Sequence, residues 1–207
     1  MAEFHQSSAL RKFKLVLAGG DLWINAHWMA ELSPYFQQLC FGENFSESKS
    51  GSVLIEDVEF QDVVAMLEYL TPDNNFQLRK KIGDKNLPAL IHCSHRFQIP
   101  SMQAEVEQWV QNDLKSPECN LKAETLVEAA IEAELANFRE STVTSLYEKL
   151  GTTQTSKAIQ NAIKDLPPVL SKKIIDETSK YNMSIKMGPG RPPIPYHWND
   201  FDMRMFF

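Results

Sequence analysis

Residues 22–58, LWINAHWMAELSPYFQQLCFGENFSESKSGSVLIEDV, decide how this chain folds. The stretch predicts the end of a strand, a short helix over 26–32, a second helix that begins at Ser33-Pro34, and a strand from Val53. The serine hydroxyl can accept a hydrogen bond from an unpaired amide at the helix start, and proline suits the first helical position because no N–H is needed there. We therefore expect a pair of helices between two strands.

The middle of this stretch joins the second helix to the strand. Phe41 and Phe45 continue the helical spacing of the second helix. Residues 46–52 are polar and small, without apolar periodicity. The sequence therefore predicts a helix that runs toward Phe45 and a polar break before the strand.

The composition is that of a folded protein with an acidic balance. The chain has 207 residues, of which 43% are hydrophobic, enough for one sizeable core with an appended subdomain. A net charge of −6 and an isoelectric point near 5.4 argue against nucleic acid as the main partner. The three cysteines are widely spread, and no signal peptide or long apolar run is visible. These features predict a soluble protein of the cytoplasm or nucleus, with no membrane partner.

Strands and helices are mixed before Ser116-Pro117, and only helices are predicted after it. Phe13–Ala18 is a predicted strand followed by a hairpin turn at Gly19–Asp21. Phe60–Leu70 has apolar residues on one helical face. Further helices are expected at 86–97, 102–114, 121–135, 137–150, 155–163 and 168–181. Gly151 is expected to end the 137–150 helix in the left-handed conformation.

Residues 183–207 form a proline-rich, aromatic C-terminal arm. The prolines predict an extended chain, and the aromatic residues make the arm too apolar for a simple solubility tail. The arm is expected either to bind a partner or to fold back over the rear helices. The residues expected to bind are Tyr196, Trp198, Phe201, Phe206 and Phe207.

No set of residues predicts catalysis. The chain has no G-x-S-x-G, P-loop or H-E-x-x-H motif, so we expect no enzyme and no cofactor. His92 and His95 share one face of a predicted helix, with Cys93 between them, and such a spacing could hold a metal. No fourth ligand is evident, so the favoured interpretation is a buried thiol between partly exposed histidines, without a metal.

Four blocks of sequence resemble the BTB/POZ family. Ile24–His27 with Leu32–Phe36 is similar to the family's F-x-A-H…S-P-Y-F run, and Val53–Val58 to its third strand. Phe60–Leu70 resembles the helix that ends in LLDYIYTG, and Cys93–Ser101 resembles A-A-x-x-L-Q-I-P-S.

This resemblance covers 13–115, about half of the chain. It implies an α+β BTB/POZ domain at 10–115, a small sheet packed with helices. The all-helical extension at 118–182 resembles the 3-box or BACK-like region of ubiquitin-ligase adaptors, and the arm at 183–207 follows it.

The resemblance also implies a function and a site. Adaptors of this kind bind Cullin-3 through an apolar residue and a glutamate two places later, which match Phe45 and Glu47 here, with Tyr35 and Phe36 framing the surface. The expected function is a non-catalytic adaptor that recruits an unknown protein client to a Cullin-3 RING ubiquitin ligase. The alternative is an oligomerisation scaffold or a transcription-linked BTB module without a cullin role.

The resemblance further implies that two copies associate as a homodimer through the first helix. The residues expected to take part are Ala26, Trp28, Met29 and Leu32. Trp28 stands where relatives carry a basic residue, so it belongs either to a hydrophobic dimer surface or to the core.

Overall fold

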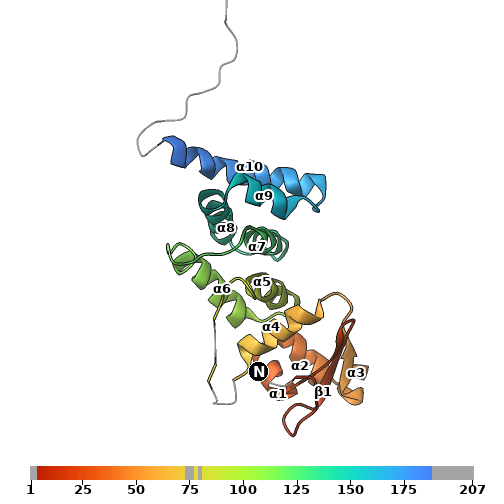
Figure 1. Cartoon of the computed structure of the whole chain (residues 1–207). Coiled ribbons are helices and arrows are strands. Elements are labelled where there is room, and N and C mark those ends of the chain that lie inside the picture. Colours follow the sequence, from red (N-terminus) through yellow and green to blue (C-terminus); the bar gives the residue numbers. More distant parts are fainter. Residues whose placement is uncertain (1–3, 73–76, 79–80, 188–207) are drawn as a thin grey trace, which may run out of the picture.

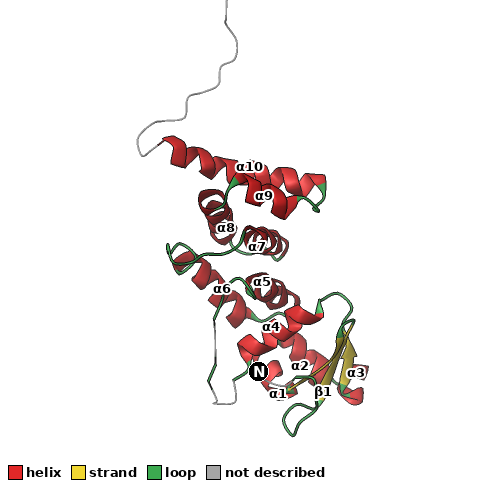
Figure 2. Cartoon of the chain, in the orientation of Figure 1, coloured by secondary structure: helices red, strands yellow, loops and turns green. Residues whose placement is uncertain are grey.

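The structure is a computed structural model that describes residues 4–72, 77–78 and 81–187. The predicted partner-binding residues of the arm, Tyr196 to Phe207, lie outside the described residues. The predicted α+β class is confirmed, because one small sheet at one end of the chain is followed by a series of helices (Figures 1 and 2).

The sheet has three strands in the order β2-β1-β3. β1 (Phe13–Leu17) and β2 (Gly20–Ile24) form an antiparallel hairpin, and β3 (Ser52–Leu54) runs parallel to β1 on its other side. Side chains alternate across a strand, so Phe13, Leu15 and Leu17 all point into the core. A parallel pair needs a long crossover, and α1 to α3 supply it.

Helices α1 (Ala26–Leu32), α2 (Pro34–Phe41) and α4 (Phe60–Leu70) lie beside the sheet (Figure 1). Ser33 starts α2 as predicted, because its side-chain oxygen accepts a hydrogen bond from the Phe36 backbone N–H. Asn25, which was not predicted as a cap, starts α1 in the same way by accepting from the Trp28 backbone N–H.

Two expectations for the segment after α2 are wrong. The second helix ends at Phe41 and does not reach Phe45. The polar run contains a short helix, α3 (Ser46–Ser50), which ends at Gly51 in the left-handed conformation with φ 67°. Serine hydroxyls and this glycine stabilise a helix that has no buried residue.

The remaining helices stack away from the sheet (Figure 2). Their bounds are α5 Leu87–Arg96, α6 Pro100–Asn112, α7 Ala123–Leu135, α8 Glu140–Thr153, α9 Ser156–Ile163 and α10 Pro168–Met187. α5 packs on both α4 and α7, and α8 packs on α7 and α10. The buried apolar residues form one continuous cluster from the sheet to Ile174 in α10.

Gly151 does not end its helix, contrary to the prediction. It lies inside α8, buried against α10, and a Cβ atom there would come within 2.6 Å of the Thr178 carbonyl oxygen. The residue is therefore a glycine because two helices approach each other closely at this point.

The variant Gly151→Ala should lower the free energy of unfolding by about 1–2 kcal/mol, because the added methyl group would push α10 away from α8. Urea denaturation measures the change. The matched control is Gly83→Ala, since a Cβ at Gly83 would meet no atom within 4 Å. Equal stability of the Gly151 variant and the wild type would contradict this account of the packing.

Candidate protein-interaction surfaces

The first surface is the turn over 42–45 that joins α2 to α3, here called the Phe45 turn. The Ser48 hydroxyl holds it by donating to the Gly42 carbonyl at 2.9 Å and to the Phe45 carbonyl at 2.8 Å. The Phe45 side chain is 41% exposed although it is a large apolar group. Its ring lies against Gly42, where a Cβ atom would come within 2.8 Å of the ring. The turn therefore presents an aromatic ring to solvent in a fixed position.

Glu47 follows on the first turn of α3 and is partly exposed. The Ser46 hydroxyl donates to its Oε2 at 3.0 Å, which orients the carboxylate. The structure thus brings an exposed phenylalanine and an oriented carboxylate together on one short segment, as the sequence predicted for Phe45 and Glu47.

Tyr35 and Phe36 have different surroundings. Phe36 is fully buried, with its ring 5.2 Å from that of Phe97, so it belongs to the core and offers no atoms to a partner. The half-buried Tyr35 ring carries the guanidinium of Arg96 over it at 5.1 Å. Arg96 also donates to Asp57 at 2.6 Å and 3.1 Å, and this pairing holds the pKa of the Asp57 carboxyl below its usual value. The tyrosine ring is therefore fixed by a cation that is itself anchored.

The second surface comprises the apolar residues of α1 that pack only partly against the core, Ala26, Trp28 and Leu32, here called the α1 face. All three are half-buried, whereas Met29, predicted with them, is only 1% exposed and belongs to the core. The Trp28 indole N–H donates to the Leu70 carbonyl at 3.1 Å. This bond fixes the indole plane between α1 and the end of α4.

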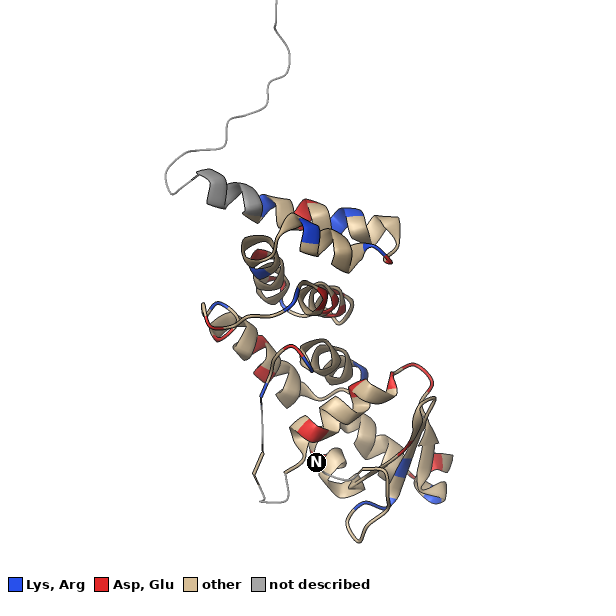
Figure 3. Cartoon of the chain, in the orientation of Figure 1, with Lys and Arg blue, Asp and Glu red and all other residues tan. Residues whose placement is uncertain are grey.

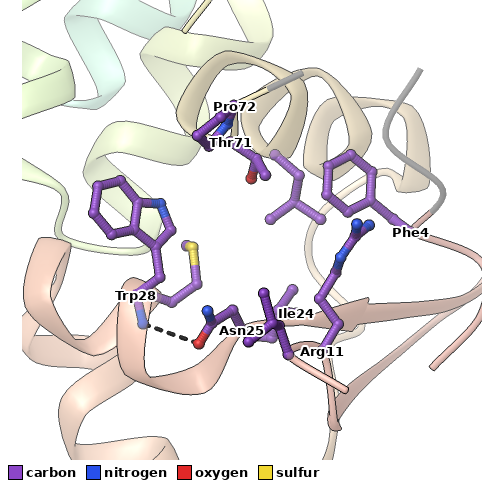
Figure 4. A pocket seen from close by; sticks show the side chains of 10 residues that line it. Phe4, Arg11, Ile24, Asn25, Trp28, Thr71 and Pro72 are labelled. Carbon is purple, nitrogen blue, oxygen red and sulfur yellow. Dashed lines mark hydrogen bonds between the residues drawn. The ribbon is translucent and has the colours of Figure 1, made fainter. Parts of the chain in front are cut away.

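A pocket of about 470 Å³ opens beside Trp28 (Figure 4). Its walls come from the N-terminal segment, the end of β2, α1 and the end of α4, and they are mainly apolar. The labelled residues that line it are Phe4, Arg11, Ile24, Asn25, Trp28, Thr71 and Pro72. A cavity of this size with mostly apolar walls is suited to bury a side chain or a small molecule.

The histidine pair of α5 is not gathered into a metal-binding cluster. His92 Nδ1 lies 2.8 Å from Glu132 Oε2 of α7, Cys93 is buried, and His95 is exposed. No group of three metal-ligating side chains occurs among the residues that the structure describes. His92 of α5 instead contacts Glu132 of α7. Acidic residues of α7 appear red in Figure 3. No local sequence pattern signals this contact, because its residues lie 40 positions apart.

The His92–Glu132 contact should make stability depend on pH. The hydrogen bond between His92 Nδ1 and the accepting Glu132 carboxylate, with the nearby charges of Asp62 and Asp57, raises the pKa of His92 above its ordinary value of 6.5. Because the pKa of His92 is higher in the folded state, the contact contributes fully to the free energy of unfolding at pH values below the unfolded-state pKa. This contribution disappears as the pH rises through the folded-state pKa.

Wild type should therefore exceed His92→Gln in stability by on the order of 1 kcal/mol near pH 5.5, and by much less near pH 8.5. Urea denaturation at both pH values measures the difference. The control is His95→Gln at an exposed position of the same helix. A wild-type advantage that is independent of pH would contradict an ionic contact.

Within the described ranges, no helix combines the length and the apolar character that crossing a membrane requires.

Comparison with known proteins agrees with this fold. The family model described as BTB/POZ domain matches residues 6–114. Cytokinesis defective protein 7 of Caenorhabditis elegans is 28% identical over 114 residues, which are 55% of this chain and 40% of that protein. Kelch-like proteins 41b and 41a of Danio rerio are each 30% identical, over 44% and 50% of this chain, but over only 14% and 17% of their own lengths.

The chain thus spans less than half the length of each of these relatives. The family model, in contrast, matches just over half of the 207 residues, including the sheet, α1 to α6 and the Phe45 turn. The predicted resemblance is confirmed: this chain belongs to the BTB/POZ domain family, and its fold is that of a protein-interaction module.

Proposed function

We propose that this chain is an adaptor that binds the N-terminal region of Cullin-3 and brings a protein client to a Cullin-3 RING ubiquitin ligase. The observation that carries the proposal is the exposed Phe45 ring, held in a fixed turn next to the oriented Glu47 carboxylate. The segment Phe45-Ser46-Glu47 has the apolar-x-glutamate pattern, and the relatives include Kelch-like BTB proteins.

The chemistry of the Phe45 turn suits such a contact. A half-exposed aromatic ring can enter an apolar groove of the partner, and aromatic residues in such positions dominate binding energy. Because Ser48 already holds the turn, little conformational entropy is lost when the ring is buried by a partner. The Glu47 carboxylate then fixes the orientation of the complex through charged hydrogen bonds. Tyr35 contributes at the edge of the proposed contact, and the buried Phe36 only supports Tyr35 from within the core.

We infer that self-association uses the α1 face together with the pocket beside Trp28. The face is apolar and half-exposed, and the pocket offers a second apolar surface next to it. In a two-fold dimer the same patch lies on both subunits, so one copy can cover the other's α1 face. A homodimer would carry two Phe45 turns and could bind two cullin molecules.

The client contact is proposed for the helices after Ser116-Pro117 and for the aromatic residues of the 183–207 arm. This division follows the proposed domains, a BTB/POZ domain at 10–115 and a helical extension at 118–182. We propose that the protein is localised in the cytoplasm or nucleus, where such an adaptor would meet its ligase.

The direct test is calorimetric titration of the full chain with the purified N-terminal region of Cullin-3. We expect saturable binding with a Kd on the order of 1 μM or tighter. The absence of both binding heat and co-elution would contradict the adaptor proposal. If self-association were retained in that case, the chain would instead be an oligomerisation scaffold without a cullin role.

The variant Trp28→Arg should shift the chain toward monomer, because a charge on the α1 face cannot be buried against a second copy without a large cost. Light scattering coupled to size exclusion at several concentrations measures the mass. The control Leu54→Arg places the same charge on β3, where the side chain is 62% exposed, and should leave the mass unchanged. A wild-type mass that is monomeric at every concentration would contradict self-association and would leave Trp28 as a residue that packs only within its own chain.

A further inference from the structure

Four serines occupy alternate positions over 46–52, and the hydroxyls of two of them, Ser48 and Ser50, hold the backbone of the loop. Ser48 donates to the carbonyls of Gly42 and Phe45. The Ser50 hydroxyl bonds the carbonyls of Glu47 and Ser52, and the Ser52 hydroxyl lies 3.5 Å from that of Ser50. Ser46 differs, because it is the serine of this run whose described hydrogen bond goes to a charged side chain, the Glu47 carboxylate. Its hydroxyl therefore acts on the proposed cullin contact and not on the loop.

We propose that Ser46 is a phosphorylation site, and that its modification disrupts the contact made by Phe45 and Glu47; this second part rests on the proposed cullin binding. The phosphate comes from a nucleoside triphosphate bound to a protein kinase. A bond forms between the Ser46 Oγ and the γ-phosphorus, the bond from that phosphorus to its bridging oxygen breaks, and the nucleoside diphosphate leaves. The hydroxyl proton passes to the general base of the kinase.

Phosphorylation turns the attractive contact between Ser46 and Glu47 into a repulsive one. The unmodified hydroxyl donates its proton to Glu47 Oε2 at 3.0 Å, which holds the carboxylate in place. A phosphate has no such proton at neutral pH and carries a charge of about −1.5 to −2, so it repels the carboxylate. Glu47 must then turn away from the position that the hydroxyl had fixed.

The phosphate also stands next to Phe45 in the chain. Burial of that ring in an apolar groove would draw the adjacent phosphate out of water, and an unpaired charge is costly to desolvate. Lys49 lies three positions along α3 and could pair with the phosphate, but an exposed ion pair on a helix is weak and does not remove this cost.

Ser46 is open to a kinase. It is exposed, α3 has only five residues, and none of them is buried, so local opening of the segment requires little free energy. Glu43 lies three positions before Ser46 and Glu47 directly after it. This acidic setting predicts an acid-directed kinase. Because Ser46 does not hold the backbone, we expect the fold to tolerate the phosphate.

The first measurement is treatment of the full chain with casein kinase 1 and ATP, followed by mass spectrometry of peptides that cover 43–53. We expect one phosphate on Ser46 and none there in Ser46→Ala, which should keep the wild-type circular dichroism spectrum. An unmodified Ser46, under conditions in which a control peptide substrate is phosphorylated, would overturn the assignment of the site.

The second measurement is titration of the Cullin-3 N-terminal region with chain that carries phosphoserine at position 46. We expect the Kd to rise by about tenfold or more, whereas Ser46→Ala should stay within about threefold of wild type. Phosphoserine at Ser156, which is exposed at the start of α9, carries the same charge and should have no effect.

The outcomes separate the two proposals. Equal binding by the unmodified and the Ser46-phosphorylated chain would overturn the switch while the adaptor function stands. Equal weakening by phosphate at Ser46 and at Ser156 would also overturn it, since the effect would then come from net charge alone. If the unmodified chain does not bind, the proposed function fails and the switch fails with it.

Discussion

The double variant Phe45→Asp/Glu47→Lys is expected to weaken binding of the Cullin-3 N-terminal region by about 3–4 kcal/mol, a factor of a hundred or more. The aspartate would place a charge where an apolar groove of the partner closes. Lysine at position 47 would place a hydrogen-bond donor opposite the partner groups that are proposed to donate to the Glu47 carboxylate. Phe45 is 41% exposed and Glu47 makes no ion pair among the described residues, so the fold itself should be retained.

Isothermal titration calorimetry measures this loss. The matched control is Leu54→Asp/Glu148→Lys, which makes the same two chemical changes and the same change in net charge at exposed positions of β3 and α8. The control should bind as wild type does. A double variant that binds within threefold of its control would contradict the assignment of the surface to the Phe45 turn.

The variant Phe97→Ala is expected to lower the free energy of unfolding by about 3–5 kcal/mol. Phe97 is fully buried at the end of α5, and its ring lies 5.2 Å from Phe36 and 5.6 Å from Tyr35. Its carbonyl also accepts the Ser33 hydroxyl at 2.5 Å, so the residue joins the start of α2 to the end of α5. Removal of the ring would leave a cavity between these two helices.

Urea denaturation followed by circular dichroism measures the loss. The control is Phe41→Ala, which removes an aromatic ring that is 47% exposed and should cost less than about 1 kcal/mol. If the two variants were equally stable, the aromatic cluster of Tyr35, Phe36 and Phe97 would not stabilise the packing of α2 on α5 as its burial indicates.

Most of the fold follows from local patterns in the sequence. Alternation in Phe13–Leu17 and the helical spacing in Phe60–Leu70 each predict the observed element, because one face of each is buried against the core. Helix α3 could not be predicted in this way, since it has no buried face and depends on serine hydroxyls and on Gly51. The role of Gly151 was also hidden, because it depends on Thr178 of a distant helix.

The candidate site combines exposed and buried residues. The motif selects Phe45, which is exposed next to Glu47, whereas the resemblance also selects Phe36 and Met29, which are in the core. The spacing of Phe36, Leu39 and Cys40 on one helical face was the available signal for burial. No comparable signal exists for the Trp28 bond to Leu70 or the His92 bond to Glu132, because each joins residues about forty positions apart.

The parallel pairing of β1 with β3 has a consequence for inhibition. The register that aligns Leu15 with Val53 anchors both ends of the segment that carries α1, α2 and α3, so the fold holds the chain on both sides of the Phe45 turn. A free peptide copied from 42–52 would have to order its backbone alone, at about 1–2 kcal/mol per residue. Such a peptide should compete poorly, and an effective antagonist would need a rigid scaffold that presents the ring and the carboxylate already in place.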